Sequence, residues 1–476
     1  MYQARFERGV CIECLLCYDA CPNDNIVSNY GLPGQGADNT CTGCKYCMDA
    51  CPTKACQIIY DPHLEEKVWS KAKVDDVRYK AETGKSQIMS CGTQDKATLF
   101  DKIVFVPGQL SRPPLLSDEK VNTSVTIGKN CKKPVTIETP IIIGAMSFGA
   151  LSKSAKIALA RGTRLSGSMA NTGEGGMLPE ERAEAKNLVV QYSTGKYGIT
   201  EEVLRSGDMI EIKIGQGAKP GMGGHLLKGK ITPEIAKVRG IKLGVDCISP
   251  SRHIGINTVK DLQNLVNRLR DTTGGVPIAI KIAAGHVEAD LEYAMAAGPD
   301  VIMIDGMEGG TGAAPIVASD QAGIPTLFAI RRAVDYLGSD KKNITLGIGG
   351  GLRDASDFAK AIALGADLVY IGTAALLPLG CRLCRTCQKG TCPVGIATQN
   401  ERLEMRLNIE DRANQLANYI KASTNELATI ARLIGKDDVS KLDINDLRAL
   451  DELTSKVTGI KLVYEDDKTI CSGGGC

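Results

Sequence analysis

Two cysteine runs within the first sixty residues constrain this chain more than any other feature of its sequence. Each run has the pattern C-x2-C-x2-C-x3-C and is followed directly by a proline, Pro22 or Pro52. The eight cysteines are Cys11, Cys14, Cys17, Cys21, Cys41, Cys44, Cys47 and Cys51. With this spacing, three thiolates of a run bind one iron–sulfur cubane and the fourth thiolate reaches the other cubane. The runs therefore predict two [4Fe-4S] clusters in a small domain over residues 1–60.

The exchange of the fourth ligand divides the eight thiols into two sets. We expect one cluster to use the first three cysteines of the first run with Cys51, and the other to use the first three of the second run with Cys21. Zinc is the alternative, because zinc sites also use paired cysteines. Two complete runs with proline are more typical of a bacterial-type 2[4Fe-4S] ferredoxin domain, which carries electrons and has no substrate chemistry of its own.

Length and charge limit the remaining possibilities. The chain has 476 residues, which predicts two or three domains, and eighteen cysteines, which indicate metal ligation rather than disulfides. Its net charge of +2 is too small to attract a nucleic acid or a membrane surface electrostatically. No apolar run approaches the ~20 residues of a membrane span, and the N-terminus does not have the pattern of a signal peptide. We expect a cytoplasmic protein.

A different pattern begins at Pro140, where short apolar runs alternate with helical stretches. The eight runs begin at Ile141, Ser168, Met209, Val245, Pro277, Asp300, Asn343 and Leu368. Alternating strands and helices indicate a parallel sheet, and eight such units predict an α/β fold of the (β/α)8 TIM barrel class. A doubly wound sheet is the alternative. We expect the barrel over residues 136–400, a linker and covering segment over 61–135, and a helical extension with a flexible tail over 401–476.

The barrel predicts a phosphate site after its seventh and eighth strands. The runs at those positions contribute Gly349, Gly350, Gly351, Gly372 and Thr373. Glycine leaves the backbone N–H groups accessible, and each run leads into a helix N-terminus, which favours an anion.

The cofactor at this site is expected to be a flavin. The ferredoxin domain delivers single electrons, whereas a two-electron reaction needs an acceptor that handles both. Lys213 and Lys281, on the third and fifth runs, are candidates to face the negative charge of a reduced flavin. The alternative for each lysine is a structural salt bridge.

Several stretches resemble the FMN-binding synthase domain of glutamate synthase. They are GAMSFGALS from Gly144, ANTGEGG from Ala170, GQGAKPGMGGHL from Gly215, DGMEGGTGA from Asp305 and CPVGIATQ from Cys392. With the ferredoxin domain in front, the chain resembles the archaeal-type stand-alone subunit. The large enzymes of this family instead begin with a glutamine amidotransferase domain and its cysteine nucleophile. Here Tyr2 follows Met1, and no such domain is expected.

The resemblance implies reductive amination of 2-oxoglutarate to L-glutamate through 2-iminoglutarate, an oxidoreductase reaction of the CH–NH2 class with hydride from FMN. It implies catalytic or substrate-binding roles for Glu174, Lys213, Gln216, Lys219 and Arg239. It implies further cofactor contacts by Gly144, Ala145, Met146, Ser147, Gly309, Gly310 and Thr311. Ammonia would arrive free or from a separate glutaminase subunit, electrons would come from a separate donor protein, and the chain would form an oligomer.

Some positions depart from the pattern of the large enzymes. Met222 stands where those enzymes have glutamate, and the segment SRHIGIN from Ser251 replaces their His-His-Asp sequence. Because these are substrate-loop positions, two alternatives stay open. One is an N-methylglutamate synthase-type subunit that acts with another amine, and the other is an electron-transfer subunit of a larger complex.

A third cysteine run follows the eighth strand. Its members are Cys381, Cys384, Cys387 and Cys392. Three of them match the ligands that hold a [3Fe-4S] cluster in the large glutamate synthases, while Cys384 is an addition. Because four thiolates normally hold a complete cubane, we prefer [4Fe-4S] over [3Fe-4S]. This cluster is expected to be the last relay before the flavin. Cys471 and Cys476, in the glycine-rich tail, are redox-active, metal-binding or inert.

Overall fold

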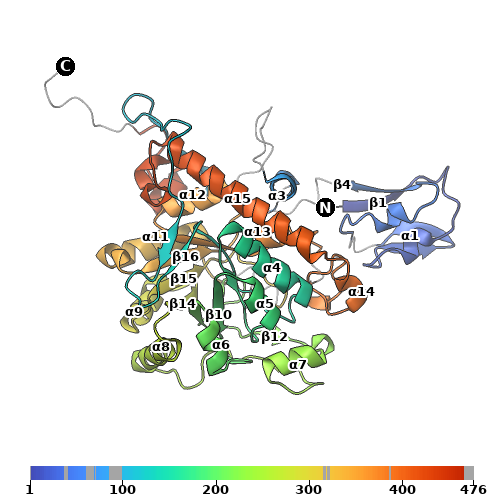
Figure 1. Ribbon diagram of the computed structural model, residues 1–476. Helices are drawn as coiled ribbons and strands as arrows, with labels where there is room; N and C mark the ends of the chain where they lie inside the picture. Colours follow the sequence, from blue (N-terminus) through green and yellow to red (C-terminus); the bar gives the residue numbers. More distant parts are fainter. Residues whose placement is uncertain are drawn as a thin grey trace.

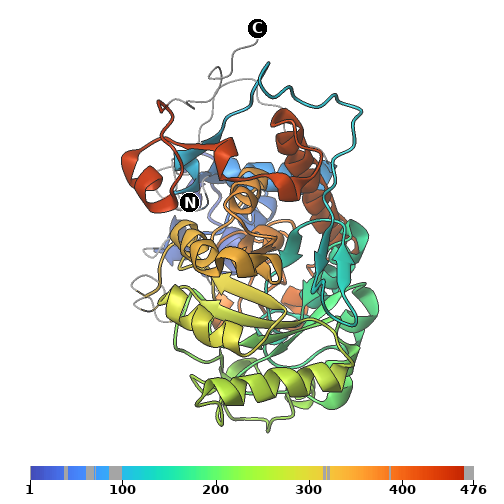
Figure 2. The same ribbon diagram turned by 90° about the vertical axis from the view of Figure 1, so that its left-hand side faces the viewer.

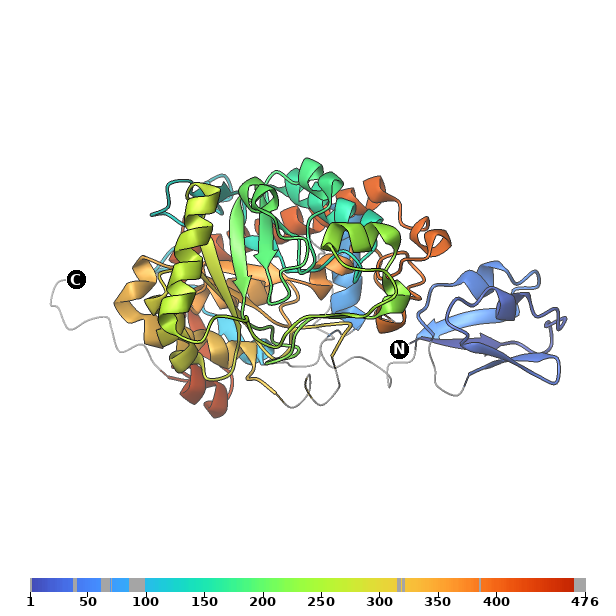
Figure 3. The same cartoon turned by 90° about the horizontal axis from the view of Figure 1, so that it is seen from below.

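The structure is a computed structural model that describes residues 2–36, 41–60, 69, 71–84, 99–314, 318, 322–384 and 387–465. Its N-terminal domain projects from one end of the molecule and lies beside α14 (Glu401–Glu404) (Figures 1 and 3). Two antiparallel strand pairs and two short helices build this domain: β1 (Tyr2–Phe6) with β4 (Cys56–Tyr60), β2 (Ile26–Asn29) with β3 (Leu32–Gln35), α1 (Leu16–Asp19) and α2 (Tyr46–Asp49). Tyr46 of α2 contacts Arg406, whose guanidinium lies 4.5 Å from the centroid of the tyrosine ring.

A barrel-like sheet of eight parallel strands forms the centre of the molecule, which confirms the (β/α)8 fold class. Its strands are β8 (Ile141–Ile143), β9 (Ala170–Asn171), β10 (Leu188–Tyr192), β11 (Met209–Lys213), β14 (Ile278–Ala283), β15 (Val301–Asp305), β16 (Thr345–Gly349) and β17 (Leu368–Ile371). Two hydrogen bonds join β8 to the start of the second unit: Ile143 N donates to Met169 O at 3.0 Å, and Ser168 Oγ donates to Ile141 O at 2.6 Å.

Helices surround the strands (Figure 2). They are α4 (Lys153–Ser166), α5 (Pro179–Glu184), α6 (Glu201–Ser206), α8 (Val259–Thr273), α9 (Val287–Ala296), α11 (Thr326–Leu337), α12 (Ala355–Ala363) and α13 (Thr373–Leu376). The sequence of α8 explains its placement, because Leu262, Leu265 and Leu269 recur on one face and are buried. Thr258 and Asp261 form a capping box at its start.

One predicted barrel strand is wrong. The run at Val245 gives β13 (Cys247–Ile248), which pairs antiparallel with β12 (His225–Leu226) outside the barrel. The barrel strand missing from the prediction is β10, whose five residues are all buried. A strand buried on both faces is continuously apolar, whereas Val245 and Ile248 are about half exposed. Lys213 therefore lies on the fourth barrel strand rather than the third.

Between β11 and α8 the chain leaves the barrel in an excursion. It comprises β12, a 3-10 helix η3 (Lys228–Lys230), α7 (Pro233–Arg239) and β13. At the opposite end of the barrel, a hairpin of β6 (Val125–Ile127) and β7 (Val135–Ile137) packs its isoleucines among the inward residues of the strands. This closure of the amino end of the barrel leaves the carboxyl ends of the strands for the site.

The C-terminal extension packs along the side of the barrel. Its long helix α15 (Ile409–Leu433) lies against α4 and α3 (Lys71–Thr83). The strand β18 (Leu447–Ala449) pairs with β5 (Ile103–Phe105), and α16 (Glu452–Thr458) follows. The remaining 3-10 helices are η2 (Phe100–Lys102), η4 (Gly338–Lys342), η5 (Cys387–Lys389), η6 (Val439–Lys441) and η7 (Ile444–Asp446).

The predicted flexible tail, with Cys471 and Cys476, lies outside the described residues. Within the described ranges, no helix combines the length and the apolar character that a bilayer span requires.

Candidate functional site

The structure gathers the N-terminal thiols into two groups of four. One cavity is lined by Cys21 together with Cys41, Cys44 and Cys47. The other is lined by Cys51 together with Cys11, Cys14 and Cys17. The fourth cysteine of each run thus faces the thiols of the other run.

These two groups of thiols fit clusters better than zinc. Among the described residues, no three His, Cys, Asp or Glu side chains converge as they would on a single metal ion. The thiols surround a space instead of meeting at a point, and this arrangement favours a cubane. Burial raises the pKa of the Cys41 thiol to about 11, and the nearby Cys47, Cys44 and Cys21 add to that rise. A bound cationic cluster would stabilise the thiolates that the protein alone does not. Ligation itself stays a prediction.

The third cysteine run forms a similar group directly after α13. Burial raises the pKa of Cys381 to about 12 and that of Cys387 to about 11. Burial also raises the pKa of Cys392, which is 5 % exposed. In all three cases the negative charge of Cys384 contributes to the rise. Cys384 therefore lies within electrostatic reach of the other three thiols, as a fourth ligand must.

An ion pair stands at the carboxyl end of the barrel strands. Lys213 ends β11, and its Nζ lies 3.1 Å from Oε2 of Glu174, which follows β9. The hydroxyl of Ser249, next to β13, donates to the other carboxylate oxygen. Burial alone would raise the pKa of Glu174, but Lys213, Ser249 and Arg239 together hold it below its ordinary value. Glu174 is therefore ionised at neutral pH.

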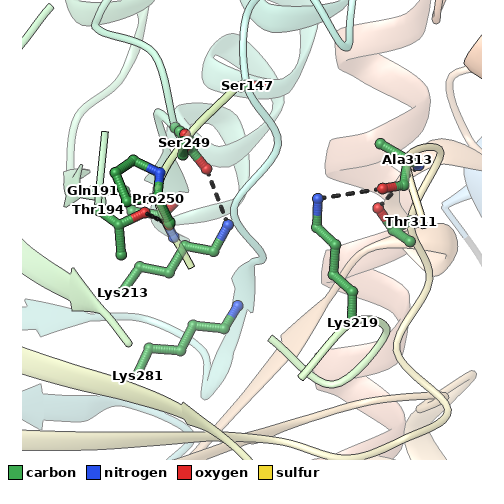
Figure 4. Close-up of polar contacts among 12 residues, drawn as sticks. Ser147, Gln191, Thr194, Lys213, Lys219, Ser249, Pro250, Lys281, Thr311 and Ala313 are labelled. Carbon is green, nitrogen blue, oxygen red and sulfur yellow. Dashed lines mark hydrogen bonds and ion pairs between the residues drawn. The ribbon is translucent and has the colours of Figure 1, made fainter. Parts of the chain in front are cut away.

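Lys219 approaches the same region from the loop after β11 (Figure 4). Lys219 is 3 % exposed, and the hydrogen bond of its ammonium to a described residue is a long one, 3.4 Å to the carbonyl of Ala313. Burial and, less strongly, the charge of Lys213 lower the pKa of Lys219 to about 8, although Glu174 partly offsets them. A buried ammonium whose desolvation is offset so little by protein groups is suited to bind an anion. Gln216 lies half-buried in the turn between the two lysines.

Lys281 points in the same direction as Lys213 from the neighbouring strand (Figure 4), but it already has counter-ions. Its Nζ lies 3.5 Å from Asp305 and 4.8 Å from the centre of the Tyr370 ring. Burial would lower its pKa, yet Asp305 and Glu211 raise it overall. This matches the salt-bridge alternative, and a flavin contact of Lys281 stays a prediction.

Arg239 is held by protein groups. Its guanidinium donates to the carbonyl oxygens of Phe148 at 2.7 Å and of Glu174 at 3.3 Å, and to Ser147 Oγ at 3.3 Å. It also lies 3.6 Å from the thiol of Cys247. Arg239 thus ties the loop after β8 to the loop after β9. Its predicted contact with a substrate carboxylate stays a prediction.

Sequence reasoning missed a second residue that holds these loops, Lys156 of α4. Its ammonium donates to the carbonyl oxygens of Met146, Asn171 and Thr172 at 2.6, 2.9 and 3.0 Å, and it pairs with Glu181 at 2.8 Å. The available signal was a lysine on the apolar face of a predicted helix. Residues 144–147, predicted to wrap a flavin ring, are positioned by this lysine and by Arg239.

The glycines after β16 and β17 are the candidate phosphate cradle. At Gly350, with φ at 115°, a Cβ would lie 2.5 Å from Thr326 Oγ1, so no side chain is accommodated there. Gly351 also has positive φ, at 69°. Gly372 is the N-cap residue of α13, and no side chain caps this helix. A Cβ added at Gly372 would have no other atom within 4 Å. These features fit a phosphate.

The contribution of the N-terminus of α12 to the phosphate site stays a prediction, because a protein side chain already caps this helix. Asp354 caps α12 and accepts from Ser356 N and Asp357 N, so these donors are already used by the protein. The loop after β15 reaches both parts of the site instead. A Cβ at Gly310 would lie 3.4 Å from Thr373 Oγ1, and one at Gly312 would lie 3.0 Å from Cys387 Cβ. The cradle and the third cysteine run are therefore neighbours. Gly309 and Thr311 belong to this loop.

Comparison with known proteins agrees with this geometry. Residues 100–437 match the family described as the conserved region in glutamate synthase, and residues 10–55 match the 4Fe-4S dicluster domain. The chain is 38 % identical over 422 residues to the archaeal-type glutamate synthase (NADPH) of Thermotoga neapolitana, with 83 % of each chain covered. It is 35 % identical over 485 residues to the protein of the same name from Dehalococcoides mccartyi, with 97 % and 95 % covered.

Solved structures agree in fold alone. A lactate oxidase of Pediococcus acidilactici superposes with a TM-score of 0.51 at 17 % identity, with 82 % of this chain and 97 % of that chain covered. A chimera of (S)-mandelate dehydrogenase gives a TM-score of 0.50 at 17 % identity, with 79 % and 99 % covered.

Proposed function

The chain belongs to the glutamate synthase family, and on this premise we propose that it makes L-glutamate by reductive amination of 2-oxoglutarate at the carboxyl end of the barrel. The observation that carries the proposal is the group of Glu174, Lys213 and Lys219. A dicarboxylate needs cations, and Lys219 is a buried lysine whose ammonium has, among the described residues, one distant carbonyl as its hydrogen-bond partner. Lys213 lies close enough to Lys219 to lower its pKa, so the two cations share one region.

The protein groups have distinct tasks in this reaction. Ammonia adds to the keto carbon of 2-oxoglutarate and water leaves, which gives 2-iminoglutarate. Glu174 is ionised and bonded to Lys213 and Ser249, so it can accept a proton as the amine adds and return it to the departing hydroxyl. Two electrons and two protons then convert the imine into glutamate.

The glycine-rich turns after β16 and β17 support FMN as the cofactor. Gly350, Gly351, Gly372 and Thr373 would hold its phosphate, and residues 144–147 would lie along its ring. Bound FMN would supply the hydride that reduces the imine carbon. Two [4Fe-4S] clusters in the N-terminal domain and a third cluster at Cys381–Cys392, [4Fe-4S] in preference to [3Fe-4S], would supply the electrons.

Gly372→Val is expected to abolish retention of FMN while the protein stays folded. The backbone of Gly372 has φ at −111°, which other residues adopt, and a Cβ there meets open space. The valine side chain would occupy the space proposed for the phosphate. We expect at least a tenfold loss of FMN per chain after desalting, with unfolding free energy changed by about 0.5 kcal/mol or less. Gly229→Val, also in open space but on the excursion, is the control and should keep its FMN. Full FMN in Gly372→Val would place the phosphate elsewhere.

The pH dependence of substrate capture follows from Lys219. Its ammonium is charged below about pH 8, so kcat/KM for 2-oxoglutarate should fall as the pH rises through about 8. The measurement needs saturating ammonia at each pH, so that ionisation of ammonium does not contribute. In Lys219→Arg the side chain stays charged, and the fall should disappear. A wild-type profile that is flat from about pH 7 to about pH 9 would contradict the assignment.

The N-terminal domain has an exit side and an entry side. Arg382, next to Cys381, lies within electrostatic reach of Tyr2 and Cys44. The cluster of Cys44 therefore faces the third cysteine run. Electrons would enter at the cluster of Cys11, where an external donor protein binds. The names of the relatives suggest that NADPH is the ultimate donor. A separate glutaminase and an oligomeric state belong to the same proposal.

A single-turnover experiment tests the function. Enzyme carrying its clusters and flavin is reduced anaerobically, and portions receive 2-oxoglutarate with ammonia, glutamine or methylamine. Glutamate from ammonia is the expected product. N-methylglutamate from methylamine in place of glutamate would support the alternative amine, and no amino acid from any portion would support the electron-transfer alternative.

A further inference from the structure

Lys230 connects the excursion to the third cysteine run. It is the last residue of η3, and its Nζ donates to the main-chain carbonyl of Cys387. Its methylene stem passes Gly390, where a Cβ would lie 3.2 Å from the lysine Cε. The excursion begins beside Lys219 and Gly224, and Gly224 closely approaches Glu174. One segment therefore reaches from the candidate substrate residues to the thiols.

The ammonium of Lys230 lies where a cluster would feel its charge. The side chain is half-buried. Its positive charge acts on Cys387, and the charges of Cys387 and Cys392 act on Lys230 in return. A one-electron reduction adds a negative charge to an iron–sulfur cluster. A fixed cation in a partly buried environment stabilises that charge, and reduction potentials respond to such surroundings.

We propose that Lys230 is a positioning residue of the third cluster, which binds the cysteine loop to the excursion and raises the reduction potential of the cluster. The proposal rests on the cluster assigned to Cys381–Cys392 in the proposed function. Its consequence is that an electron from the N-terminal domain is held beside the flavin cradle until a second electron follows.

A potentiometric titration monitored by EPR tests this inference in the full chain with its clusters and flavin. Lys230→Gln removes the charge but keeps an amide donor for the Cys387 carbonyl, and Lys230→Met removes both. In each variant we expect the equilibrium constant for reduction of the third cluster to fall about tenfold, which is about 59 mV for a one-electron couple. The potentials of the two N-terminal clusters should not change.

Two further variants separate charge from structure. Lys230→Arg keeps the charge and should keep the wild-type potential. Lys228→Met removes an equal charge from the same 3-10 helix, but Lys228 is exposed, so its effect should be negligible.

The possible outcomes separate this inference from the proposed function. A wild-type protein with no third cluster signal would refute the cluster itself. An unchanged midpoint in Lys230→Gln would overturn the role of Lys230 and leave glutamate synthesis untouched. If Lys230→Met loses iron, the midpoint potential of the third cluster in Lys230→Gln decides whether the charge of Lys230 raises the potential.

Discussion

Lys213→Met is expected to lower the rate of glutamate formation from 2-oxoglutarate and ammonia by about 10²- to 10³-fold. Among the described residues, Lys213 is the only cation that forms an ion pair with Glu174, and it lies near Lys219. Its loss would let the pKa of Glu174 rise and would remove the cation that holds this carboxylate in position for proton transfer. Steady-state turnover under anaerobic conditions measures the effect. Lys237→Met, at an exposed lysine of α7, is the matched control.

The same substitution is also expected to lower the free energy of unfolding. Both side chains of the pair are about 10 % exposed, and removing one partner of a buried pair costs about 3–5 kcal/mol. The double variant Lys213→Met/Glu174→Gln leaves no unpaired charge and should recover most of the unfolding free energy, while remaining inactive. Denaturant unfolding of the four proteins completes the cycle. A double variant that regains activity, or a single variant within threefold of the wild-type rate, would remove the pair from the chemistry.

Cys384→Ser is expected to convert the third cluster from [4Fe-4S] to [3Fe-4S]. The structure places Cys384 within electrostatic reach of Cys381, Cys387 and Cys392, and we expect its thiol to bind the fourth iron. Without it, one corner of the cubane has no thiolate, and an iron is lost. EPR of the oxidised protein should then show the [3Fe-4S] signal, with one iron fewer per chain. FMN should stay bound, because three thiolates still anchor the loop after β17.

A second measurement separates the cluster from the substrate reaction. Transfer of electrons from the N-terminal domain to the flavin should slow in Cys384→Ser, since cluster type helps to set the potential. Turnover with an artificial two-electron reductant of the flavin should survive. Cys131→Ser, far along the chain from any cysteine run, is the control and should change neither signal. A [3Fe-4S] signal at full occupancy in anaerobically prepared wild type would show that Cys384 is not a ligand.

Local patterns determined much of this protein. The spacing of the N-terminal cysteines predicts which four thiols gather, because the helical turns within each run and the reach of the fourth residue are local properties. Alternation of apolar runs with helices predicts the barrel class, because each unit must bury its strand under its helix. Glycine repeats such as 349–351 mark a cradle, since only glycine tolerates φ at 115° beside Thr326.

The tertiary structure decided which charged residues remain available for a ligand. Lys213, Lys219, Lys281 and Arg239 look alike as cations near strand ends. Folding gives Lys281 the carboxylate of Asp305 and gives Arg239 the carbonyl of Phe148, from segments 24 and 91 residues away. Within the part of the chain that the structure describes, it leaves Lys219 with a single distant carbonyl. The register of distant segments sets these partners, and no local periodicity encodes it. The choice of β10 over the run at Val245, and the contact of Lys230 with Cys387 across 157 residues, have the same origin.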